Sequence, residues 1–168
     1  PIPDWSFEAP DGSFLARRAD ARNMPFPEAC FDAVACVSTI EHIAGDGDIL
    51  AAREIGRVLK PGGKAFISVP YGQESHERRT HGGAFERVYD RAALLSRLAE
   101  PAALAVEETG FLLDARSRRV THAMYYDLPG RWRYLLGWHS AFVASWLSAR
   151  DRASEADAWV AYLLLKKR

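Results

Sequence analysis

Apolar residues gather in three short runs, FDAVACV at 31–37, KAFISVP at 64–70 and AWVAYLLL at 158–165. The first is nearly continuous rather than alternating, which is typical of a strand buried on both faces of a parallel sheet. We expect each run to form a strand. Residues 14–18 and 104–113 have weaker strand character, and Gly110 marks a bulge in the second of these.

Helical spacing of apolar positions appears between the first two runs. The pattern over residues 46–60 predicts a helix capped by Asp46 or Asp48 and ended by the Pro-Gly-Gly sequence at 61–63. Residues 89–98 predict a second helix. Strands separated by helix-length segments indicate right-handed crossovers in a parallel sheet.

The remaining segments are polar or rich in turn residues. Residues 1–12, 23–30 and 120–130 are expected to be irregular, and 71–88 to form a long polar loop. Residues 131–149 are aromatic-rich and predict a helix. The expected organisation is one domain over 1–168 with an aromatic-rich insertion at 120–150.

The composition argues against several classes of function. The chain has 168 residues, with 22 Lys and Arg against 22 Asp and Glu, so bulk electrostatic binding of nucleic acid is disfavoured. Its two cysteines, Cys30 and Cys36, form no CxxC pair, which argues against a disulfide framework or zinc site and fits a cytoplasmic protein. No apolar stretch is long enough to span a membrane.

Residues that could bind a ligand lie at the ends of the predicted strands, where open α/β sheets bind their ligands. Asp20 can accept hydrogen bonds from an exocyclic amine, and the N–H of Ala21 can donate to a ring nitrogen, which together would read an adenine edge. Ser38 and His42 follow the strand at 31–37, and a third strand end carries RVLKPGGKAFISVPYG at 57–72.

Three motifs together resemble one family. They are D-A-x-x-M-P-F-P-x-x-x-F-D-x-V at 20–34, E-H-I at 41–43 and R-V-L-K-P-G-G at 57–63, followed by a strand ending in V-P. In this order and spacing they resemble the class I, type 11-like S-adenosylmethionine-dependent methyltransferases of small molecules. The resemblance is tight over residues 19–72. It implies a Rossmann-like α/β fold whose sheet is mostly parallel, with an antiparallel final strand.

The resemblance also implies roles for single residues. Asp20, Ala21 and Phe26 match the family's adenine contacts, and Cys36 and Val37 match the strand end whose backbone faces the methionine part of the cofactor. Ser38 and His42 lie on the short segment that leads into the substrate cavity. Ser38 is a further candidate cofactor contact, and His42 is the candidate base. The candidate substrate-binding residues are His42, Tyr71, His81 and Trp138.

One element of the family is missing from this sequence. The family has a glycine-rich turn of GxGxG type after its first strand and an acidic residue after its second, and nothing before Phe14 supplies either. The polypeptide therefore resembles a family member that lacks the first strands. Their absence is expected to leave an apolar sheet edge at 31–37 exposed.

Several alternatives stay open. The spacing of His76 and His81 is not that of a zinc-binding pair. The loop that contains them is either a cavity lid or a solvated segment. Arg78, Arg79 and Arg87 are candidates to meet an anionic substrate. The aromatic segment that contains Trp138 forms core, acceptor pocket or a dimer face.

The sequence thus predicts methyl transfer from S-adenosylmethionine to a small molecule or biosynthetic intermediate, with no metal, nucleic-acid or membrane partner and with a homodimer as an option. The alternative is a non-catalytic scaffold that does not bind the cofactor. A dehydrogenase is disfavoured because no GxGxxG occurs.

Overall fold

A four-stranded sheet forms the centre of the computed structural model, in which residues 6–13, 15–80, 82–112 and 154–168 are described. Its strands, in spatial order, are β3 (Phe31–Val37), β4 (Leu59–Pro70), β8 (Val160–Lys166) and β7 (Ala105–Leu112). β3 and β4 are parallel, whereas β8 is antiparallel to both of its neighbours. The predicted strand pattern, including the antiparallel final strand, is confirmed.

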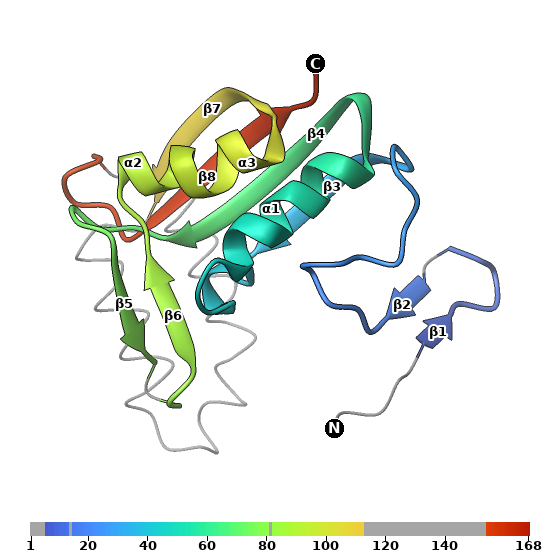
Figure 1. Cartoon of the computed structure of the whole chain (residues 1–168), viewed down its shortest axis with the longest axis horizontal. Coiled ribbons are helices and arrows are strands. Elements are labelled where there is room, and N and C mark those ends of the chain that lie inside the picture. Colours follow the sequence, from blue (N-terminus) through green and yellow to red (C-terminus); the bar gives the residue numbers. More distant parts are fainter. Residues whose placement is uncertain (1–5, 14, 81, 113–153) are drawn as a thin grey trace.

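Helices cover one face of this sheet in the described part of the chain (Figure 1). α1 (Gly47–Val58) lies beside a continuous helical segment made of α2 (Arg91–Ala93), the π-helical η2 (Leu94–Ala99) and α3 (Glu100–Ala102). The core between helices and sheet is apolar, and its largest fully buried side chains include Ile40, Ile55, Leu59, Ile67, Leu94, Leu98, Leu163 and Leu165. The helices predicted at 46–60 and 89–98 are confirmed, with ends shifted by a few residues.

Two hairpins include segments for which the sequence predicts irregular chain. β5 (His76–Arg79) pairs with β6 (Phe85–Val88) inside the expected loop at 71–88, and β1 (Ser6–Glu8) pairs with β2 (Leu15–Arg17), which lies within the strand predicted at 14–18. β1 and β5 are short and exposed, so hydrophobic periodicity gave no signal for them. Pairing in the first is supported by an ion pair between the cross-strand partners Arg78 and Glu86.

β3 is an edge strand rather than the doubly buried strand that its composition suggests. In the described residues its one sheet neighbour is β4, and Val37 at its carboxyl end is 57% exposed. Val34 and Cys36 pack against the core, while Ala33 and Ala35 on the other face are exposed. The prediction of an exposed apolar edge is consistent with this arrangement.

The ends of α1 are held by contacts that the sequence does not reveal. Asp46 occupies the N-cap position but makes no side-chain capping hydrogen bond. At the other end, Lys167 Nζ donates to the carbonyl oxygens of Gly56 and Leu59, each at 2.8 Å. An ammonium there satisfies unpaired carbonyls and offsets the negative end of the helix dipole. The helix therefore ends before Pro61, and the Pro-Gly-Gly sequence belongs to a turn of β4 where Gly62 has φ +78°.

Gly110 does not form the predicted bulge. The register of β7 with β8 shifts between Val106 and Glu108 instead. A Cβ at Gly110 would lie 2.1 Å from the ring of Tyr162, so the glycine makes room for that ring. The predictions for residues 120–150, including Trp138, and for His81 lie outside the described residues.

Candidate cofactor site

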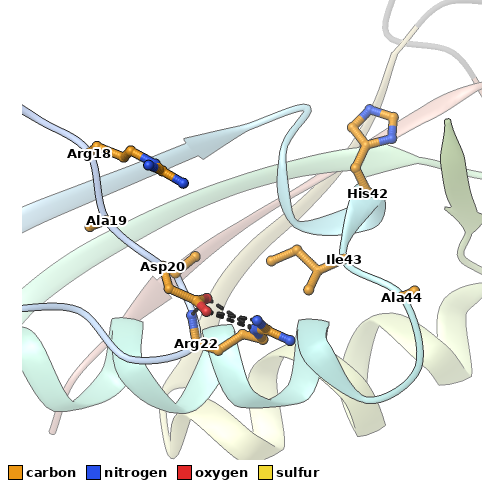
Figure 2. A pocket seen from close by; sticks show the side chains of 8 residues that line it. Arg18, Ala19, Asp20, Arg22, His42, Ile43 and Ala44 are labelled. Carbon is orange, nitrogen blue, oxygen red and sulfur yellow. Dashed lines mark hydrogen bonds and ion pairs between the residues drawn. The ribbon is translucent and has the colours of Figure 1, made fainter. Parts of the chain in front are cut away.

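An open hollow of about 620 Å³ lies between the segments that come after β2 and after β3 in the chain. It is lined by two segments: residues 18–22, which follow β2, and residues 42–44, which begin at the last residue of the short 3₁₀ helix η1 (Ile40–His42). Figure 2 shows Asp20 and Arg22 on one side and His42 with Ile43 and Ala44 on the other. The structure therefore brings together Asp20, Ala21 and His42, which the sequence predicts to share a site.

Asp20 is held in the hollow by its neighbour Arg22. The Arg22 guanidinium donates to both carboxylate oxygens, with Nη2–Oδ2 at 2.7 Å and Nε–Oδ1 at 3.0 Å, and the Arg22 N–H donates to Oδ1 at 2.9 Å. These hydrogen bonds lower the pKa of Asp20 from 3.8 to about 2. Asp20 is thus an anionic acceptor at neutral pH, and its side chain is 49% exposed and open to a ligand donor.

A second, apolar hollow of about 320 Å³ adjoins the first. The two share Ala21 and Ile43, and the second adds Phe26 and Cys36 among its lining residues. Burial raises the pKa of the Cys36 thiol, so this group is an apolar wall rather than a nucleophile. Four of the six predicted cofactor contacts, Asp20, Ala21, Phe26 and Cys36, therefore line one continuous concave surface.

The loop that carries Met24 and Phe26 is clamped onto α1. Glu54 Oε2 accepts the N–H of Met24 at 2.7 Å, and the Arg57 guanidinium donates to the carbonyls of Phe26 at 2.8 Å and Met24 at 3.1 Å. Arg57 also bonds both oxygens of Glu54. Arg57, the first residue of the R-V-L-K-P-G-G motif, therefore fixes the wall of the apolar hollow.

We expect Arg57→Ala to loosen this loop. Two main-chain carbonyls and the Glu54 carboxylate lose their donor, at a cost of about 1–3 kcal/mol in the free energy of unfolding. Amide hydrogen exchange at residues 24–26 should accelerate more than exchange in β4. The control is Arg53→Ala on the exposed side of the same helix, which should leave exchange in the loop unchanged. Equal acceleration in both variants would contradict the clamp.

The other predicted cofactor and substrate residues lie elsewhere. Val37 and Ser38 are not among the described residues that line either hollow. Ser38 has φ +45°, a left-handed conformation that is rare for serine, and its N–H donates to the carbonyl of Ser68. Tyr71 lies at a third hollow, beyond the end of β4, and its hydroxyl donates to Glu155 at 2.9 Å. Burial, then that hydrogen bond, raise the pKa of Tyr71 to about 12. The roles of these three residues stay predictions.

The arginines predicted to meet an anionic substrate are engaged in internal contacts. Arg87 lies 3.3 Å from Asp48 and 2.9 Å from Glu77, Arg78 pairs with Glu86, and Arg79 donates to the carbonyl of Gly83. That prediction is therefore wrong for Arg87, which is buried and contacts Asp48 in the first turn of α1 and the Gly45 carbonyl just before that helix.

Sequence reasoning missed Asp48 as the centre of this buried network. Its carboxylate accepts from Arg97 at 2.7 and 2.8 Å and from the hydroxyl of Tyr89 at 2.9 Å, and its side chain is 0% exposed. Burial alone would raise the pKa of Asp48, but the donors from Arg97 and Tyr89 lower it below 3.8. The network joins the turn behind the hollow to β6 and η2. In the sequence, Asp48 in the first turn of the predicted helix indicated only a helix cap.

Comparison with known proteins shows what this chain is similar to. A family model described as a methyltransferase domain matches residues 6–67, the segment that holds both hollows. The chain shares its fold with solved methyltransferase structures. One of them, a 1,6-didemethyltoxoflavin-N1-methyltransferase from Burkholderia thailandensis, was solved with bound S-adenosylhomocysteine.

Solved structures share the fold at low identity. The Burkholderia methyltransferase is 15% identical with a TM-score of 0.54, over 88% of this chain and 48% of its own. A methyltransferase from Archaeoglobus fulgidus is 11% identical with a TM-score of 0.56, over 94% and 70%. The cyclase SpnF is 23% identical with a TM-score of 0.51, over 89% and 54%. The chain thus spans about half the length of two of these three structures.

In the part of the chain that the structure describes, no helix is long and apolar enough to cross a membrane. Within the same residues, no group of three or more His, Cys, Asp or Glu side chains is arranged to hold a metal ion.

Proposed function

We propose that this domain takes part in methyl transfer from S-adenosylmethionine to a small-molecule acceptor, with the hollow at Asp20 as the adenine side of the cofactor site. The observation that supports it most is the juxtaposition of an anionic acceptor, Asp20, with an apolar hollow that Ala21 and Phe26 help to line. An adenine needs both, because its exocyclic amine donates and its ring faces are apolar.

The residues present fit one half of the cofactor. Asp20 would accept the adenine amine, the Ala21 N–H would donate to a ring nitrogen, and Phe26 would border the ring. The sequence contains no GxGxG turn that could contact the rest of the cofactor. The cofactor supplies an activated methyl group and its own leaving group, so the protein mainly binds, aligns and excludes water.

His42 is the candidate group on the acceptor side. It lies across the hollow from Asp20 (Figure 2), and its Nδ1 is 2.7 Å from the carbonyl oxygen of Phe85 in β6. A base is needed only where the acceptor loses a proton on methylation. The third hollow, of about 320 Å³ and lined by Tyr71, Gln73 and His76 among others, is the proposed place for part of the acceptor.

The test is an NMR titration of the domain with S-adenosylhomocysteine. We expect amide shift changes centred on Asp20, Ala21 and Met24, and we expect Asp20→Ala to weaken binding by about tenfold or more, because a hydrogen bond to a charged acceptor contributes about 1.5–3 kcal/mol. Asp11→Ala is the matched control, since Asp11 also accepts the N–H two residues on and lies outside the hollow. Shift changes confined to other parts of the domain would rule out this site.

A second function, a scaffold without cofactor, is favoured by one observation. Among the described strands, β3 has no partner on its outer edge, and this edge lies next to an apolar hollow, a surface suited to covering by protein. The fold itself does not decide between the two, since a cyclase also has it. The same titration decides: no shift change at the hollow at any ligand concentration supports the scaffold.

A further inference from the structure

The third hollow, beyond the end of β4, is lined on one side by residues 156–159, which lead into β8. Figure 1 shows this segment, in red, beside the end of β4 and the start of β5. Gln73 ties the two sides together, because its Nε2 donates to the carbonyl oxygens of Glu155 and Ala156, each at 3.1 Å. The volume of about 320 Å³ is at the low end of ligand pockets, which span roughly 300–1,000 Å³, so the hollow suits a small ligand.

The polar groups that this hollow leaves available are mostly acceptors. Both N–H bonds of the Gln73 amide are used by the two carbonyls, and no described residue donates to its Oε1. Asp157 Oδ2 accepts from the Ser154 hydroxyl at 2.8 Å, while no described residue donates to Oδ1. The Tyr71 hydroxyl is engaged, because it donates to Glu155 at 2.9 Å. A ligand in this hollow therefore needs donors of its own.

The charges around the hollow favour a cationic ligand. Arg78 also lines it, but its guanidinium pairs with Glu86 across the hairpin, so these two charges offset each other. The His76 Nδ1 lies 3.0 Å from the carbonyl oxygen of Glu74, so the neutral ring presents Nε2 as a further acceptor. The carboxylate of Asp157 is exposed and has no ion-pair partner among the residues that the structure describes. The described lining thus carries one uncompensated negative charge.

Aromatic residues contribute to the apolar wall of the same hollow. Trp159 and Tyr71 line it from the two facing segments, and the Tyr71 N–H donates to the carbonyl oxygen of Trp159 at 2.8 Å. The face of an aromatic ring is negative and attracts a cation placed over it, most strongly for tryptophan. The rings and the Asp157 carboxylate therefore select for the same kind of ligand.

We propose that the third hollow binds the amine end of a small molecule. Its ammonium group is held by the Asp157 carboxylate and by Oε1 of Gln73, and the ring or apolar group next to it packs on Trp159 and Tyr71. As the acceptor of a methyl group this molecule rests on the proposed function, whereas as a ligand of the hollow it does not. An ammonium has no lone pair, so the amine serves recognition and is not the atom that receives the methyl group.

The test compares benzylammonium, benzyl alcohol and benzoate, which share one ring, on the domain without cofactor. Nitrogen-15 NMR reports on the hollow, since Gln73 is the one glutamine and Asn23 the one asparagine in the sequence, and the Trp159 indole is assigned with a Trp159→Phe variant. We expect benzylammonium to shift the Gln73 amide and Trp159 indole signals, to leave Asn23 unchanged, and to bind about tenfold more tightly than benzoate. Benzyl alcohol should fall between the two.

Asp157→Asn removes the charge but keeps an oxygen that can accept from Ser154. Benzylammonium should then bind about twofold to fivefold more weakly, whereas the affinity for benzyl alcohol should stay the same. Glu74→Gln is the matched control, because Glu74 is exposed and lies outside the lining of the hollow. It should change neither affinity.

Each outcome decides the proposal. Benzoate or benzyl alcohol binding as tightly as benzylammonium overturns it, as do Gln73 and Trp159 signals that benzylammonium does not move. An equal loss of affinity in Asp157→Asn and Glu74→Gln, or no loss in Asp157→Asn, also overturns it. Because the probes are added without S-adenosylhomocysteine, failure here leaves the cofactor site untouched, and failure of the cofactor titration leaves the amine site untouched.

Discussion

Asp48→Asn should lower the free energy of unfolding by about 3–5 kcal/mol, the cost of removing one partner from a buried ion pair. The substitution preserves shape but removes the charge that Arg97 and Arg87 share, and it leaves two guanidinium groups and the Tyr89 hydroxyl with a weaker acceptor. Urea unfolding, with circular dichroism to follow helix content, measures the loss.

Asp46→Asn is the matched control. Asp46 bonds the same Arg97 at 3.1 Å, but its side chain is 79% exposed. An exposed pair contributes about 0–1 kcal/mol, so the two aspartates, two residues apart, should differ severalfold in effect. A similar loss in both variants would contradict a stabilising role of the buried network.

The effect of Asp48 should also depend on pH. Its folded-state pKa is lowered below the ordinary 3.8, so the stability that it contributes is present above that value and is lost as pH falls through the folded-state pKa. The difference between wild type and Asp48→Asn should therefore be constant from neutral pH to about pH 5 and should shrink below pH 4. A difference that grows with acidity would contradict the assigned sign.

Gly56→Ala should destabilise the domain by about 1–3 kcal/mol, as expected for overpacking. A Cβ at Gly56 would lie 2.0 Å from the carbonyl oxygen of Ala102, because α1 and α3 approach each other closely there. The obstacle is main chain, so relief requires a shift of a whole helix. The measurement is the urea midpoint of the variant.

The sign of this effect separates packing from helix propensity. Alanine is favoured over glycine inside a helix by about 1 kcal/mol, so propensity alone predicts a more stable variant. Stabilisation by Gly56→Ala would contradict the close approach of the two helices.

Continuous apolar runs made the central sheet predictable, since FDAVACV, KAFISVP and the run before the carboxyl end all became strands. The hairpin at 76–88 was not predictable in this way because its strands are polar. They are held by cross-strand charges and by Arg87, whose partner Asp48 is distant in sequence.

The same limit applies to the candidate site. The motif around Asp20 indicated an acceptor at a strand end, and the structure places it in a hollow with His42. Nothing in the motif indicated that Arg22 would fix the carboxylate or that Glu41 would be buried beside the imidazole. These features depend on how loops fold back onto α1 and β6, which local sequence does not encode.

Calorimetric titration of S-adenosylhomocysteine into this domain tests the central claim most directly: that the adenine side of the site is present and the glycine-rich turn is not. Two or three charge-assisted hydrogen bonds contribute about 4 kcal/mol, so their absence turns a site of about 1 µM into one of about 1 mM. We therefore predict no measurable heat at micromolar ligand, alongside the localised NMR shifts at millimolar ligand. Micromolar affinity in calorimetry would contradict the account, because the residues of this chain would then complete the site by themselves.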